Sequence, residues 1–135
     1  MAIPAERRYR APVVDTIHYP LDGEEDLTDQ THIVIGWLLG PITDPLATLR
    51  ARLLSDVLLD NSSSPLRHAL ETSELGASPS PLCGFDTSTR EATFVCGLEG
   101  SNPEQAEAVE TLVLDVLRRV AAESVPQEAV DAALH

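Results

Sequence analysis

The chain has 135 residues and a formal net charge of -13, from 22 acidic and 9 basic side chains. This length suits one domain, which buries about two thirds of the surface that the unfolded chain exposes. The negative charge would repel phosphate backbones, which argues against nucleic acid as a partner. All nine basic residues are arginine, so the sequence excludes Schiff-base chemistry on a lysine and points to a GC-rich bacterial genome.

No stretch reaches the roughly 18 apolar residues that cross a bilayer, and residues 1–10 lack the apolar centre of a secretory signal. We therefore expect a soluble, cytoplasmic, bacterial protein. Cys83 and Cys96 fall in segments that read as strands, where free structural thiols are the leading interpretation. A disulfide between them and a reactive nucleophile are the alternatives.

Residues 1–30 are expected to form an extended arm that leads into the domain. They carry prolines, a basic start and an acidic group, without a lasting hydrophobic period. Such charge runs favour a solvated linker over a targeting peptide. Within the arm, Val13–Tyr19 could add a short edge strand, because Pro12 and Pro20 would end its ladder on both sides.

The segment Thr31–Leu39 predicts a central strand, since it is rich in β-branched residues and ends at Gly40-Pro41. Alternation along a strand gives it two faces. The bulky face suits packing under helices and comprises Ile33, Ile35, Trp37 and Leu39. The thin face, on which Gly36 leaves room for an approaching group, comprises His32, Val34, Gly36 and Leu38.

Asp44-Pro45 predicts a helix start, with a capping side chain followed by a proline at the first position. Apolar residues follow at spacings of three and four, and we expect them to form one core stripe: Leu46, Leu49, Leu53, Leu54, Val57 and Leu58. At about 2 kcal/mol for each buried side chain, this stripe would contribute on the order of 10 kcal/mol before entropy is subtracted.

A second, short helix is expected from Pro65 to Glu74. Ser64 can accept hydrogen bonds from its free amides, and Pro65 suits its first position. Gly76 can end it in the left-handed conformation. Its apolar side comprises Leu66, Ala69 and Leu70.

Residues 77–99 predict a hairpin, with strands at Pro81–Phe85 and Glu91–Glu99 around a polar turn. One face of the second strand carries Phe94, Cys96 and Leu98, and the other carries Thr93, Val95 and Gly97. Gly97 is a second thin point.

Asn102-Pro103-Glu104-Gln105 predicts the start of the longest helix, with a cap, a first-position proline and a capping-box glutamine. A further helix is expected to begin at Pro126, with Ala129, Val130, Ala133 and Leu134 on one side.

The order strand, helix, helix, strand, strand, helix, helix predicts an α+β fold: a two-layer sandwich with a mixed or antiparallel sheet and helices on one face. The chain stops while the last helical pattern is still running. We therefore expect residues 31–135 to be a partial domain of a longer protein. An unpaired sheet edge and an uncovered apolar face would then favour self-association of the isolated piece.

Three separated segments carry a family resemblance: TxxxxxWLLG at 31–40, LLSDVLLDNSSSPLRHALETSELG at 53–76 and REATFVCGLEG at 90–100. Their order resembles the second, non-catalytic domain of the presequence-protease branch of the pitrilysin/insulinase zinc metallopeptidases. The likeness covers about residues 28–135. It implies an insulinase or mitochondrial-processing-peptidase type of fold, and a parent of four related domains that clasp a peptide-sized chamber.

By that resemblance, the chain is a non-catalytic wall of the chamber of a zinc endopeptidase that degrades peptides. The zinc would lie in another domain of the parent, and the partners would be the remaining domains and the peptide substrates. The residues His32, Gly36, Thr93 and Gly97 would look into the chamber. The structural motif of the short helix comprises Ser64, Pro65, Leu66 and Gly76.

Catalysis in this superfamily needs a His-x-x-Glu-His motif and a distal carboxylate ligand, and the motif is missing from this chain. The nearest approach is His68-Ala-Leu-Glu71-Thr72, where threonine replaces the second histidine. We interpret His68 and Glu71 as ordinary neighbours on a helix surface. We therefore expect no catalytic residue, no metal site and no cofactor in this chain.

Two alternatives stay open. The chain could be a stand-alone interaction or dimerisation module, which a gene of only this length would favour. It could also be a thiol hydrolase that pairs Cys83 or Cys96 with a histidine, although nothing in the sequence places such a pair together.

Overall fold

The computed structural model describes residues 10–23 and 26–123. Its elements follow in the order β1 (Thr31–Pro41), α1 (Pro45–Leu59), α2 (Pro65–Thr72), β2 (Ser78–Pro79), β3 (Gly84–Asp86), β4 (Glu91–Ser101), the 3-10 turn η1 (Pro103–Gln105) and α3 (Ala106–Glu123). Within these described residues, no helix has the length and apolar character that a membrane crossing requires. The helix expected from Pro126 lies outside the described residues.

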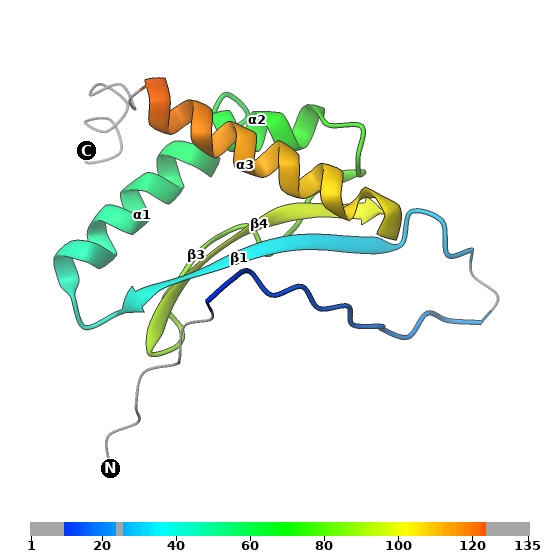
Figure 1. The fold of residues 1–135 in the computed structure, drawn as a ribbon, viewed down its shortest axis with the longest axis horizontal. Helices are drawn as coiled ribbons and strands as arrows, with labels where there is room; N and C mark the ends of the chain where they lie inside the picture. The colour runs from blue at the N-terminus through cyan, green and yellow to red at the C-terminus, as the bar shows by residue number, and fades with distance from the viewer. Residues whose placement is uncertain (1–9, 24–25, 124–135) are drawn as a thin grey trace, which may run out of the picture.

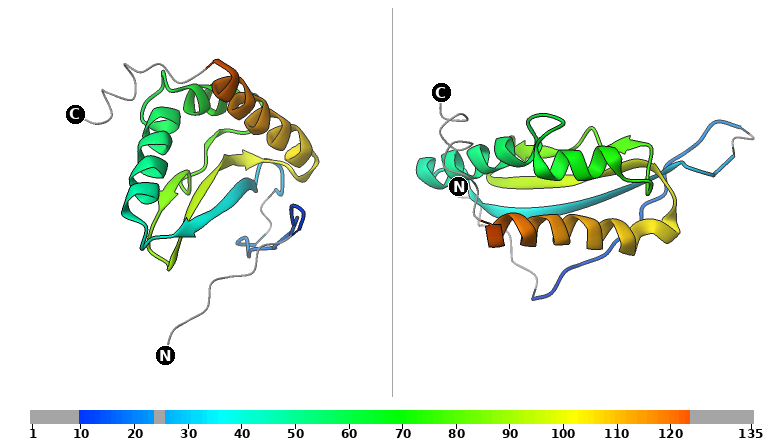
Figure 2. Two further views of the ribbon diagram at one scale, coloured as in Figure 1. Left: turned by 60° about the vertical axis from the view of Figure 1, so that its left-hand side comes forward. Right: turned by 90° about the horizontal axis from the view of Figure 1, so that it is seen from above.

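The sheet is antiparallel and centres on β4. β1 pairs along one side of β4, and the shorter β2 and β3 pair along the other. All three α-helices lie on one face of this sheet, above the strands in Figure 1, and Figure 2 shows the same layer from two other sides. The predicted α+β two-layer sandwich is confirmed, with an antiparallel sheet.

The core lies between the sheet and the helices. The alternation predicted for β1 and β4 holds there, because Ile33 and Phe94 are buried while Val34 on the opposite face is 44% exposed. The buried apolar cluster comprises Ile33, Leu58, Leu66, Leu70, Phe94, Cys96, Leu98, Val109, Val113 and Val116. Leu39, expected under the helices, is instead 48% exposed, because it is the extra residue at a shift in register between Leu38 and Gly40, where strand alternation breaks.

Helix α1 begins at Pro45, as predicted, and the Asp44 carboxylate accepts a hydrogen bond from the Ala47 amide at 3.1 Å. The expectation that its leucine stripe is core is wrong for half of the stripe. Leu58 is 3% exposed, but Leu49 is 47% exposed, and Leu46 and Leu54 are exposed as well. Ser55 is buried, so α1 turns a face beside the leucine stripe toward the core.

Helix α2 ends at Thr72, and the prediction that Gly76 terminates it in the left-handed conformation is wrong. Gly76 is not among the glycines with positive φ. A side chain there would place its Cβ 2.9 Å from the Glu99 oxygen, so glycine lets the loop press against β4. Pro65 is the first helical residue, as predicted, and Leu66 is fully buried.

The capping roles of Ser64 and Asn102 also differ from the prediction. Ser64 occupies the position before α2, but its side chain makes no capping hydrogen bond; its hydroxyl accepts from the Asn61 amide at 3.1 Å. Asn102 likewise makes no cap, because its amide is engaged by Asp29. In both cases a partner elsewhere in the loops competes for the side chain.

Val13–Tyr19 does not form the expected edge strand. This part of the arm is drawn below β1 in Figure 1, and its apolar side chains are exposed, with Val14 at 87% and Ile17 at 82%. The Tyr19 ring meets the His32 ring edge to face, with 5.7 Å between centroids, and the Tyr19 hydroxyl donates to the Gln30 carbonyl.

Candidate functional site

The open face of the sheet, opposite the helices, gathers three of the four residues predicted to look into a chamber: Gly36, Thr93 and Gly97. β1 and β4 pair so that Val34 lies opposite Gly97, Gly36 opposite Val95, and Leu38 opposite Thr93. Residues directly opposite in an antiparallel pair share a face, so the two thin faces predicted from the sequence coincide. We refer to Val34, Gly36, Leu38, Thr93, Val95 and Gly97 as the open sheet face.

The two glycines of the open sheet face have different roles. A Cβ at Gly36 would meet only the Val95 Cγ2 atom at 3.6 Å and the Phe94 oxygen at 3.9 Å, and Gly36 is exposed. A Cβ at Gly97 would lie 2.0 Å from the Ile33 oxygen. Gly36 therefore leaves free surface, whereas Gly97 is buried and permits the close approach of β1 to β4.

His32 lies at the start of β1 and is exposed, in contact with Tyr19 of the arm. The surface near Gly36 is apolar, since Val34 and Leu38 are both exposed large side chains. The open sheet face carries small and aliphatic side chains, and none of its six members is ionisable.

The pair His68 and Glu71 is held in local contacts that do not fit a metal site. Glu71 accepts a hydrogen bond from the Arg67 Nε atom at 2.8 Å, while His68 Nδ1 lies 3.2 Å from the Ser62 carbonyl oxygen. The Arg67 hydrogen bond, followed by one from Ser62, lowers the pKa of Glu71. Among the residues that the structure describes, no group of three His, Cys, Asp or Glu side chains could hold a metal ion.

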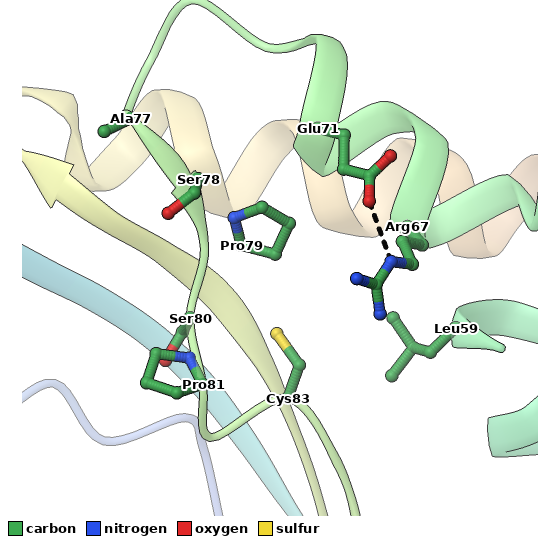
Figure 3. Close-up of a pocket in the computed structure, with 9 residues that line it drawn as sticks. All are labelled: Leu59, Arg67, Glu71, Ala77, Ser78, Pro79, Ser80, Pro81 and Cys83. Carbon is green, nitrogen blue, oxygen red and sulfur yellow. Dashed lines mark hydrogen bonds and ion pairs between the residues drawn. The ribbon is translucent and has the colours of Figure 1, made fainter. Parts of the chain in front are cut away.

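A pocket that the sequence did not suggest lies between α2 and the loop before β3 (Figure 3). Its volume is about 550 Å³. It is lined by Leu59, Arg67, Glu71, Ala77, Ser78, Pro79, Ser80, Pro81 and Cys83. The Ser-Pro-Ser-Pro run at 78–81 could have indicated an irregular segment beside β4, because proline lacks the backbone N–H that a strand ladder needs.

Both cysteines are free thiols on the helix side of the sheet. Cys83 lies in the turn before β3, not in a strand as predicted, and its Sγ atom is 3.6 Å from the Gly97 carbonyl oxygen. Cys96 lies within β4 and is 0% exposed. Burial raises the pKa of Cys83, and burial together with the neighbouring Cys83 raises the pKa of Cys96 to about 12.

The sequence of this chain matches a known protein family and several known proteins. The family model described as the Peptidase M16 inactive domain matches residues 4–135. The mitochondrial presequence protease of Xenopus tropicalis is 33% identical over 135 residues, covering 99% of this chain and 13% of that protein. The protein of that name in Emericella nidulans is 35% identical over 126 residues, with coverages of 93% and 12%. In Yarrowia lipolytica the identity is 33% over 116 residues, with coverages of 86% and 12%.

Proposed function

This chain belongs to the Peptidase M16 inactive domain family, and we propose that it forms part of the chamber wall of a larger zinc metalloendopeptidase that degrades peptides. The membership confirms the family resemblance found in the sequence. The observation that carries the proposal is the match to an inactive domain by a chain without a His-x-x-Glu-His motif. The chain itself then positions peptides, and another domain of the parent holds zinc and cleaves them.

Three exposed leucines of α1, Leu46, Leu49 and Leu54, which we call the leucine face, support the proposal that this chain contacts other domains of a larger protein. Leu46, Leu49 and Leu54 are exposed on a helix whose other face packs on the core, which costs free energy in water. The chain spans 12–13% of the length of the relatives described above, so most of a protein of that kind lies outside it. We propose that this leucine face packs on another domain of the same polypeptide.

The open sheet face supports contact with peptide. Because Gly36 has no side chain, a peptide can come close to the backbone of β1 at this point. The exposed side chains of Val34 and Leu38 lie beside it and offer apolar contact to an unfolded peptide. Of the predicted chamber residues, we propose that His32, Gly36 and Thr93 face the peptide. Gly97 shapes the strand pairing beneath them.

The net charge of -13 would attract basic peptides over distances comparable with the Debye length. Binding of a cationic peptide should then weaken as salt rises from low to physiological strength. Binding that is independent of salt would remove the electrostatic part of the proposal and leave the rest.

The source and compartment stay predictions. The relatives compared above come from a frog and two fungi and are named mitochondrial, which does not support the expected bacterial origin. The cytoplasmic location expected from the sequence also stays a prediction. The stand-alone module is the weaker alternative, because the matched relatives are about eight times longer.

The test compares this chain with the full-length protein that contains it, using hydrolysis of a fluorogenic peptide. We expect the 135-residue chain to be inactive and the full-length protein to be active and inhibited by a chelator. In the full-length protein, Gly36→Trp should lower kcat/KM for long peptides, while Leu82→Trp, at an exposed turn outside the open sheet face, should not. Chelator-sensitive hydrolysis by the 135-residue chain alone would overturn the proposal.

A further inference from the structure

Cys83 immediately precedes β3, and β3 pairs with the residues of β4 that come just before Cys96. Gly84 pairs with Val95, Phe85 with Phe94 and Asp86 with Thr93. Extending this antiparallel register by one residue places Cys83 opposite Cys96. In a regular antiparallel ladder, opposed residues have Cβ atoms about 4.5–5.5 Å apart, which is close to the roughly 3.5–4.5 Å of a disulfide.

Both side chains also belong to one packed cluster. Cys96 is a member of the buried core, and Cys83 is partly buried against that core. Cys83 is also close enough to affect the ionisation of Cys96: after burial, it is the second cause of the raised pKa of Cys96. The opposed register and the shared cluster therefore agree that the thiols are neighbours.

The two thiols differ in access. Cys96 is 0% exposed, whereas Cys83 is half-buried and lines the 550 Å³ pocket, with its sulfur directed toward the pocket in Figure 3. A low-molecular-weight disulfide can therefore approach Cys83 and cannot reach Cys96 directly.

We propose that Cys83 is a thiolation site and that Cys96 is the thiol that resolves it. The Cys83 thiolate attacks one sulfur of a low-molecular-weight disulfide such as oxidised glutathione, forming a mixed disulfide and releasing one small thiolate. The Cys96 thiolate then attacks the Cys83 sulfur and releases the second small thiolate. Two protein thiols and one small disulfide become one protein disulfide and two small thiols, with the two protons passing to the released thiolates.

The product would tie the turn before β3 to the centre of β4 at the wall of the pocket. The raised pKa values of both thiols keep most of each sulfur protonated at neutral pH. The exchange should consequently be slow at pH 7 and faster as pH rises, because the thiolate is the nucleophile.

Digestion with trypsin provides a direct readout on the 135-residue protein, because cleavage after arginine separates the cysteines into peptides 68–90 and 91–118. After treatment with oxidised glutathione and alkylation of remaining thiols, we expect mass spectrometry without reduction to find these two peptides linked. In Cys96→Ser the reaction should stop at a glutathione adduct on Cys83. In Cys83→Ser, the rate of thiol loss should fall at least about tenfold, because the remaining thiol is buried.

Circular dichroism of each variant establishes that it is folded before the reaction is compared. A wild-type protein that accumulates the mixed disulfide without linking the peptides would overturn the resolving role of Cys96. A Cys83→Ser protein that reacts as fast as wild type would overturn the thiolation site. If the disulfide between the two peptides formed only between two protein molecules, the proposed attack of Cys96 on Cys83 within one molecule would be wrong.

Discussion

Asp29 and Asn102, 73 positions apart in the chain, exchange two hydrogen bonds at the end of the sheet. The Asp29 amide donates to the Asn102 Oδ1 atom at 2.9 Å, and the Asn102 Nδ2 atom donates to the Asp29 carboxylate at 2.8 Å. Asp29 adopts a φ of 59°, in the left-handed region that non-glycine residues seldom enter. The clasp fixes the start of β1 to the residue that follows β4.

Replacing Asn102 by alanine removes both hydrogen bonds of this clasp. Because the site is partly exposed, water replaces part of what is lost, and we expect the free energy of unfolding to fall by about 1 kcal/mol. Thermal unfolding should then shift down by about 4 °C. Asp29→Gly is the matched variant: it loses the carboxylate but relieves the positive φ, so its shift should be smaller. Equal shifts for the two variants would contradict this account.

Gly97→Ala tests the close approach of β1 to β4. An added Cβ would lie 2.0 Å from the Ile33 oxygen and 2.7 Å from the Val34 Cα atom, both backbone atoms that cannot move without parting the strands. We expect a loss of about 3 kcal/mol or more in the free energy of unfolding, or failure to fold. Gly36→Ala, whose Cβ would have ordinary contacts, is the control and should change stability by less than about 1 kcal/mol. Urea unfolding of both variants measures the difference.

Local signals in the sequence predicted the fold better than they predicted the contacts. Asp44-Pro45 predicted the start of α1, and alternation predicted which face of β1 is bulky, because caps and strand periodicity act over a few residues. Gly76 was misread because what requires glycine there is the approach of Glu99, a contact between distant segments. The partner of Asn102 is equally non-local.

The orientation of α1 was missed for a related reason. A stripe of leucines predicts an apolar contact but does not say which surface provides it. The structure packs Ser55 and Leu58 on the core and leaves Leu49 exposed. Which residues lie on one face of β1 and on one face of β4 could be predicted, because alternation acts along each strand. The pairing of β1 with β4, which brings these two faces together, is a contact between distant segments and was not predicted.

Leu58→Ala and Leu49→Ala form a matched pair on the same helix with the same change in volume. Leu58 is 3% exposed, so its truncation should cost about 2–5 kcal/mol of unfolding free energy. Leu49 is 47% exposed, and its truncation in the 135-residue chain should cost less than about 1 kcal/mol. If the leucine face packs on another domain, Leu49→Ala should become clearly more costly in the full-length protein. An unchanged cost there would contradict the proposed interdomain contact.

The buried thiol of Cys96 predicts a loss of stability at alkaline pH. Its pKa rises from an ordinary value of 9.0 to about 12, chiefly through burial. Below pH 9 both folded and unfolded chains hold the proton, so the shift costs nothing. Between pH 9 and 12 the unfolded chain releases the proton while the folded chain keeps it, and the free energy of unfolding falls by up to about 1.4 kcal/mol per pH unit, about 4 kcal/mol in total.

Urea unfolding measured from pH 8 to 11 under reducing conditions tests this slope, and the absence of lysine removes the commonest group that titrates in the same range. Cys96→Ala should start at a lower stability, because a packed sulfur is lost, but its profile should be flatter. Cys83→Ala should flatten the profile less, since Cys83 is only half-buried. Parallel profiles for wild type and Cys96→Ala would show that the Cys96 thiol does not govern alkaline unfolding.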